Sequence, residues 1–151
     1  MINYVSLQSD TMDAQTVFQP KIWYIVCGAF AALGAVENMI NAETWAESAW
    51  GADGVNDQSI AHEMFFGVVF LAFSAMAFVS AFLLDGSTQA KFAMANAGVM
   101  VAFFVAMFIV LPAQGYELPG VTWLIPPLVL MGGLGTSGFL HKDGEAPAAE
   151  A

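Results

Sequence analysis

The sequence is poor in basic residues and in cysteine. It contains no arginine, three lysines and one cysteine, against 13 aspartates and glutamates, so its formal net charge at pH 7 is -10. Proteins bind nucleic acids by neutralising phosphates with lysine and arginine, and this composition excludes that class of partner. The one cysteine, Cys27, can form neither an intrachain disulfide nor a cysteine metal site, and we interpret it as a packing residue.

Recognisable catalytic motifs are also missing. The glycine-rich stretch MGGLGTSG, residues 131–138, lacks the Lys-Ser/Thr pair that follows a phosphate-binding loop. The stretch ADGVNDQS, residues 52–59, lacks the alternating oxygen ligands and final glutamate of a calcium loop. The sequence therefore predicts no catalytic residue and favours a protein that is not an enzyme, while the identity of any cofactor stays open.

Long apolar runs dominate what is present. Hydrophobic residues make up 58% of the chain and charged residues 11%, whereas soluble proteins are roughly 25% charged. A helix needs about 20 apolar residues to cross a bilayer. Four windows approach that length, and we predict spans near residues 21–41, 60–84, 91–113 and 121–140. The sequence thus predicts an all-α integral membrane protein with a four-span membrane domain over residues 21–140.

Short connections indicate how these spans are arranged. The links DGSTQA, residues 85–90, and AQGYELPG, residues 113–120, are too short for anything except neighbouring antiparallel helices. We therefore predict an antiparallel four-helix bundle. The fourth span contains Pro126 and Pro127 and is predicted to be kinked there, because proline removes a helical hydrogen bond.

The lysines predict the orientation of the bundle. Lys21, Lys91 and Lys142 all fall at one end of the predicted bundle, whereas the 42–59 and 113–120 connections carry acids and no lysine. The positive-inside rule then places both termini in the cytoplasm. Composition does not distinguish a cell membrane from an organelle membrane.

Three segments lie outside the predicted spans. Residues 1–20 form a polar N-terminal segment whose acids precede any apolar run, unlike a cleavable signal peptide. The outer loop, residues 42–59, begins within NAETWAESAWG, residues 41–51, in which tryptophans at helical spacing predict a short helix lying on the membrane. The acidic tail, residues 141–151, has no apolar face to bury, and we expect it to be disordered.

Small residues within the spans indicate helix packing. Helices in lipid associate through close approach at glycine and alanine rather than through hydrophobic exclusion. The glycines that we predict as packing positions are Gly28, Gly67, Gly98, Gly132 and Gly133. Faces of this kind fit a lipid bilayer environment and further contacts with protein partners or with other copies of the chain.

The candidate site is a polar cluster at the outer ends of the first two spans. It comprises Glu37, Asn38, Asn41, His62 and Glu63, which the predicted bundle brings to a similar depth. Ionisable groups inside a membrane indicate function by default, here a proton or cation site. The alternative is a plain helix end, because a carboxylate in a first turn is favoured by the helix dipole.

A metal or haem site fits this cluster poorly. His62 and Glu63 are adjacent, and adjacent helical residues point about 100° apart, so they cannot easily share one ion. A haem held by two histidines would need His62 and His141, which the predicted bundle places at opposite faces of the membrane. We therefore predict no metal ligand.

Three hypotheses about function remain open. The first is a non-catalytic accessory or scaffolding subunit of a membrane assembly. The second is a proton- or cation-coupled transporter or channel that uses Glu37, His62 and Glu63, and the third is a membrane enzyme or a carrier of pigment, haem or quinone. The layout of one span, a looped outer segment, a charged start to the second span and two short-linked spans resembles small four-span bacterial membrane families of the DoxX kind. This resemblance is one of layout and implies no site residue.

Overall fold

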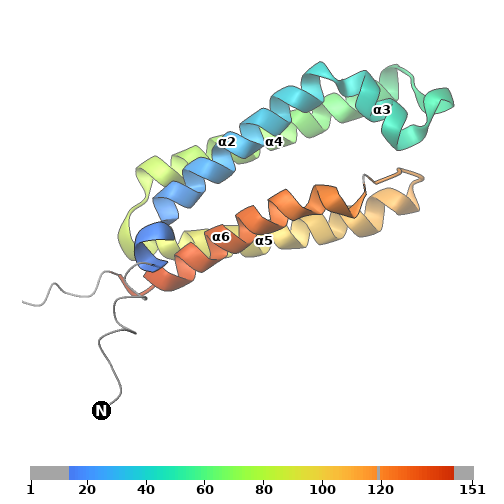
Figure 1. The fold of residues 1–151 in the computed structure, drawn as a ribbon. Coiled ribbons are helices and arrows are strands. Elements are labelled where there is room, and N and C mark those ends of the chain that lie inside the picture. The colour runs from blue at the N-terminus through green and yellow to red at the C-terminus, as the bar shows by residue number, and fades with distance from the viewer. Residues whose placement is uncertain (1–13, 119, 145–151) are drawn as a thin grey trace, which may run out of the picture.

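The computed structural model describes residues 14–118 and 120–144, and over these residues the chain is helical with no β-strand (Figure 1). The long helices are α2 (Pro20–Ile40), α4 (Asp57–Leu83), α5 (Gly86–Ala113) and α6 (Ile125–His141). The prediction of four helices long and apolar enough to cross a membrane is confirmed. Shorter elements are α3 (Ala42–Trp50) and the 3-10 helices η1 (Ala52–Gly54) and η2 (Val121–Leu124). The predicted features of residues 1–13 and 145–151 lie outside the described residues.

Two helices begin before the predicted membrane spans, because polar residues extend the helices beyond their apolar runs. α4 begins at Asp57 rather than near residue 60, since the Asn56 side chain accepts hydrogen bonds from the backbone of Gln58 and Ser59. Ser59 Oγ in turn accepts from the Asn56 backbone N–H at 2.9 Å, which completes a capping box. Asn56 therefore sets the start of the helix, ahead of the apolar run.

α5 begins at Gly86, so most of the predicted link DGSTQA is helical. Gln89 stabilises this start, because its side-chain amide donates hydrogen bonds to the carbonyls of Ser80, Ala81 and Leu84 at the end of α4. These are carbonyls that a helix end leaves without helical partners. The turn between α4 and α5 thus shortens to Leu84 and Asp85.

The proline pair lies at the start of α6. Pro126 and Pro127 occupy its first turn, where the missing N–H groups break no helical hydrogen bond. The backbone changes there from the 3-10 form of η2 to the α form, between Leu124 and Ile125.

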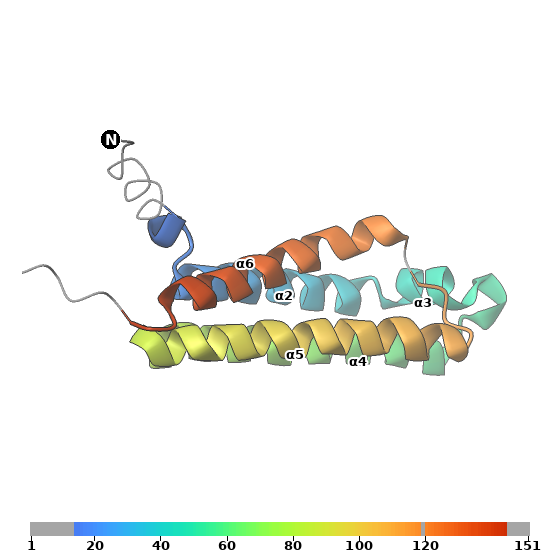
Figure 2. The ribbon, with the colours of Figure 1, turned by 90° about the horizontal axis from the view of Figure 1, so that it is seen from below.

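The long helices form two pairs. α2 lies beside α4 and α5 lies beside α6 (Figure 1). Seen from below, α6 lies in front of α2 and α5 lies in front of α4 (Figure 2). The pairs lie close together at the end where α2 starts and α6 finishes, and they separate toward the end at which α3 lies (Figure 1). We call these the lysine end, after Lys21, Lys91 and Lys142, and the α3 end.

Three of the predicted packing glycines allow close contacts inside the chain. A Cβ atom on Gly67 of α4 would lie 3.0 Å from the carbonyl oxygen of Ala35 on α2. A Cβ on Gly28 would touch the ring of Phe78 at 3.2 Å, and one on Gly133 of α6 would overlap the ring of Trp23. These glycines hold α2 against α4 and α6. By contrast, a Cβ on Gly98 or Gly132 would meet no described atom within 4 Å.

The buried core sits toward the lysine end, where the two pairs meet. It comprises Tyr24, Cys27, Ala81, Ala93, Ala97, Met131 and Leu134. Polar bonds cross the same region: Asn96 donates to the hydroxyl of Tyr24 at 3.1 Å, and Ser74 donates to the carbonyl of Gly28 at 2.8 Å. Toward the α3 end, the short helix α3 packs on α4 with Ala42, Ala46 and Ala49 as its buried face.

Candidate functional site

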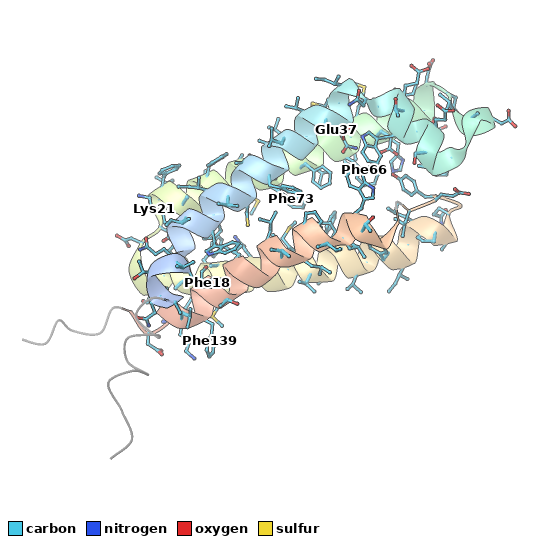
Figure 3. The ribbon with its side chains drawn as sticks, in the orientation of Figure 1. Phe18, Lys21, Glu37, Phe66, Phe73 and Phe139 are labelled. Atoms are coloured by element: carbon cyan, nitrogen blue, oxygen red, sulfur yellow. The ribbon has the colours of Figure 1, made fainter. Side chains whose placement is uncertain are left out.

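An apolar cleft of about 470 Å³ lies between the α2–α4 pair and the α5–α6 pair. Aromatic rings and methionine side chains supply most of its lining. Phe66 and Phe73 of α4 lie in the space between the two helix pairs (Figure 3), with Phe104 and Met107 of α5 across from them in the lining. The cleft exists because the two pairs separate from the core toward the α3 end.

The end of the cleft nearest α3 is polar. Glu37, in the last turn of α2, lies there (Figure 3) and accepts a hydrogen bond of 2.7 Å from Trp45 Nε1. Its other carboxylate oxygen accepts from Asn41 Nδ2 at 3.1 Å. The ring of Trp45 meets that of Trp123 nearly at a right angle, with centroids 5.3 Å apart. We call Glu37, Asn38, Trp45, Tyr116 and Trp123 the polar mouth of the cleft.

A second polar group surrounds Glu63, just behind Tyr116. Glu63 is only 1% exposed, and its Oε2 accepts a hydrogen bond from the Tyr116 hydroxyl at 3.4 Å. Its Oε1 is buried without a hydrogen-bond partner among the described atoms, and so is Nε1 of Trp50. The Trp50 and Tyr116 rings contact each other edge to face at 5.4 Å. His62 lies beside them, with its ring centroid 5.1 Å from that of Phe66.

The surroundings of Tyr116 shift the pKa of its phenol. Burial is the main cause that raises the pKa of its phenol above the ordinary value, and the negative charge of Glu63 and the hydrogen bond to it add to the effect. Tyr116 lies between α5 and η2, outside the four apolar helices. Its phenol therefore stays protonated and serves as the hydrogen-bond donor to the buried carboxylate.

The five residues of the predicted cluster fall into two groups. Glu37, Asn38 and Asn41 belong to the cleft side, whereas His62 and Glu63 belong to the group behind Tyr116. No hydrogen bond or ion pair within residues 14–118 and 120–144 joins one group to the other. Tyr116 connects them, because it lines the cleft and also donates to Glu63.

Sequence reasoning did not assign a site role to the aromatic residues of the mouth. Trp45 was predicted as part of a short helix lying on the membrane, and no site role was predicted for Tyr116 or Trp123. The sequence feature that could have indicated a site is the presence of several aromatic residues near the same span ends as Glu37.

Basic side chains lie far from this mouth. Lys21 lies at the lysine end, near the Phe82 ring, and Lys142 lies over the Phe139 ring at the same end (Figure 3). Lys91 is in the second turn of α5, also at the lysine end. Within the described part of the chain, Glu37 therefore has only neutral hydrogen-bond donors and no cationic partner.

Metal ligands and histidines are not gathered at the cleft. Among the residues that the structure describes, no three His, Cys, Asp or Glu side chains group as metal ligands, and neither His62 nor His141 lines the cleft. Comparison of the chain with protein-family models, curated proteins and solved structures found no match.

Proposed function

We propose that this protein is a non-catalytic membrane protein that binds an elongated apolar molecule, such as a quinone, a polyene pigment or a lipid chain, in the cleft between its helix pairs. The observation that carries the proposal is an apolar cleft of about 470 Å³ lined by aromatic rings and thioethers. Ligand pockets typically enclose about 300–1,000 Å³ and are mostly apolar with a few polar groups at fixed places. The cleft matches both properties, with its polar groups concentrated at the mouth.

The lining favours a non-protein occupant over a partner helix. A helix in lipid docks where small residues let backbones approach. Here the glycines that make such contacts, Gly28, Gly67 and Gly133, are already used between helices of the chain itself. The cleft instead presents Phe66, Phe73 and several methionines, whose flexible thioethers adapt to irregular shapes. Such walls suit a flat ring system or a flexible chain.

Among the cofactor classes, haem is the least favoured. A haem needs an axial ligand, which can be a histidine, cysteine, methionine or tyrosine side chain. Neither histidine of the described chain lines the cleft, so the ligand would have to be Cys27 or a methionine or tyrosine of the lining. A quinone, a polyene or an acyl chain needs only apolar walls and a polar contact at one end.

The proposal includes an orientation in the membrane. The four helices cross the bilayer in an antiparallel bundle with both termini in the cytoplasm, and the polar mouth lies at the opposite surface. The three lysines support this, because they lie at one end of the molecule while α3 carries Glu43 and Glu47 at the other. α3 lies along that outer surface, and the fourth span bends where η2 meets α6, beside Pro126.

A second candidate function is that of an accessory subunit that packs against a partner through α5. The observation favouring it is a row of small, exposed residues on that helix, made of Ala95, Gly98, Ala102 and Ala106. The row follows helical spacing, and a Cβ on Gly98 would meet no described atom within 4 Å. Ligand binding in the cleft and docking through α5 use different faces and are compatible.

Proton or cation transport is less favoured. Its candidate groups Glu37, His62 and Glu63 all lie at the α3 end, and Glu37 is separate from the group that contains His62 and Glu63. Between that end and the core, the lining of the cleft is almost entirely apolar. A conducting path would need polar groups or water along that length.

The test is to identify what the protein carries. The chain is purified in mild detergent, extracted with organic solvent and analysed by absorbance and mass spectrometry. A control is the same chain washed extensively with detergent. We expect one class of apolar molecule to be retained at a fixed ratio to protein through the wash. Retention of only the bulk lipid mixture, falling continuously with washing, would contradict the proposal.

A further inference from the structure

We propose that the polar mouth selects an amphiphile whose head group is a cation, specifically an ammonium, over neutral or anionic molecules with the same chain. This inference rests on the proposed function, because it assigns the head group of the molecule whose chain fills the cleft. The negative charge of Glu37 and the groups around it are complementary to a cationic head group.

The first argument is the unbalanced charge of Glu37. Its two oxygens accept hydrogen bonds from Trp45 and Asn41, which are neutral donors. A carboxylate offers about four acceptor positions, so these two bonds fix its direction and leave capacity for another donor. An ammonium group in the mouth would supply both a positive charge and, if it carries hydrogens, further donors.

The second argument is the position of Glu37 within α2. It lies in the last turn of the helix, which ends at Ile40, where the helix dipole presents its negative end. A carboxylate at this position is unfavourable alone, whereas a cation is favoured there. The dipole and the carboxylate therefore act in the same direction on a ligand head group.

The third argument is the set of rings around the carboxylate. Trp45 and Trp123 meet at an angle of 80°, which forms an aromatic corner next to Glu37. Tyr116 completes the lining of the mouth. Aromatic faces attract ammonium groups, and tryptophan does so most strongly.

The fourth argument is the field at the α3 end. This end carries further acids on α3, η1, the first turn of α4 and the loop after α5: Glu43, Glu47, Asp53, Asp57 and Glu117. The three lysines, Lys21 at the start of α2, Lys91 near the start of α5 and Lys142 after α6, lie at the lysine end. The summed potential raises the local concentration of cations and repels anionic head groups.

The test compares head groups on one chain. A hexadecyl probe bearing a diazirine is photo-crosslinked to the protein in neutral detergent. Hexadecyltrimethylammonium, hexadecanol and hexadecyl phosphate then compete with the probe. We expect the ammonium to compete about tenfold more effectively than the alcohol, with the phosphate weakest, as a desolvated cation–π and carboxylate contact implies. The preference should shrink as salt is added, because screening weakens it.

Two matched variants test whether the preference for ammonium depends on Glu37. Glu37→Gln keeps the hydrogen-bond acceptor for Trp45 and should reduce the preference for the ammonium over the alcohol severalfold. Glu43→Gln removes an acid from the same end that does not line the cleft, and it should retain most of the preference. Both variants must show the helical circular dichroism of the parent chain.

The outcomes separate the two proposals. If the probe labels the wild-type protein saturably but all three competitors act equally, the head-group inference is wrong and the cleft remains a binding site. Unchanged selectivity in Glu37→Gln would also overturn the inference. If Glu37→Gln does not fold, the salt dependence of the wild-type protein decides the matter. A preference for ammonium that does not change with salt concentration would then overturn the head-group inference. If labelling does not saturate at all, the proposed function itself fails.

Discussion

The indole N–H of Trp45 donates a 2.7 Å hydrogen bond to the carboxylate of Glu37, and this bond joins α3 to the last turn of α2. It fixes the Trp45 ring beside that of Trp123 and shapes the mouth of the cleft. Trp45→Phe keeps an aromatic ring and removes the donor. We expect it to lower the free energy of unfolding by about 1 kcal/mol and to weaken ligand retention. Thermal unfolding in detergent measures the change in stability. The control is Trp123→Phe, which removes an indole from the same corner but no described hydrogen bond. Equal melting temperatures for the wild type and Trp45→Phe would contradict it.

Packing between α2 and α4 depends on Gly67. A methyl group there would press on the carbonyl of Ala35 and on Met39, so Gly67→Ala should destabilise the protein by about 1–3 kcal/mol. Gly98→Ala is the matched control, because it adds the same methyl group to an exposed helical glycine with open space around it. It should be neutral or stabilising by up to about 1 kcal/mol. A melting temperature that falls equally in both variants would show that the α2–α4 contact is not decisive.

Stability at alkaline pH should depend on Tyr116. The unfolded chain releases the phenol proton near the ordinary pKa of about 10, whereas burial and the nearby Glu63 raise the pKa in the folded protein. Above about pH 10 the unfolded state therefore binds fewer protons than the folded state. The contribution of Tyr116 to stability is complete below that pH and is lost as the pH rises toward the pKa of the folded protein. Melting temperatures from pH 8 to 11 should fall more steeply for the wild type than for Tyr116→Phe. Parallel curves would contradict this role.

The proposed orientation can be tested by labelling. Single cysteines at Asp53 and Glu117, in a Cys27→Ala background, should react with a membrane-impermeant thiol reagent added to intact cells. A cysteine at Ser87, in the first turn of α5, should react only after the membrane is opened. Reaction of the Ser87 position from outside would reverse the orientation.

The sequence was sufficient to predict the four helices, because the bilayer fixes the length of an apolar helix. Two helices extend beyond the predicted spans where polar side chains bind backbone groups, as Gln89 does at the start of α5. Apolarity alone gives no sign of such bonds.

The candidate site was only partly predictable. Glu37 and Glu63 were predicted as candidate site residues near one end of the bundle, yet sequence does not define how each helix is rotated about its axis. That rotation directs Glu37 to the cleft and Glu63 behind Tyr116. The cleft arises from the separation of two helix pairs, which depends on contacts such as Trp23 against Gly133. These contacts link residues more than one hundred positions apart and leave no local pattern.

The most direct test of the cleft as a ligand site is photo-crosslinking of the hexadecyl diazirine probe to a matched pair of glycine variants. Gly34 lines the cleft, and a Cβ there would meet only the Phe70 ring, at 3.9 Å, so Gly34→Leu fills the cleft without breaking a helix contact. Gly98→Leu adds the same side chain on an exposed face away from the cleft. We predict saturable labelling of cleft residues such as Phe73 and Met107 in the wild type and in Gly98→Leu, and at least a fivefold loss in Gly34→Leu. Equal labelling of all three proteins, or labelling spread evenly over lipid-exposed residues, would contradict the account.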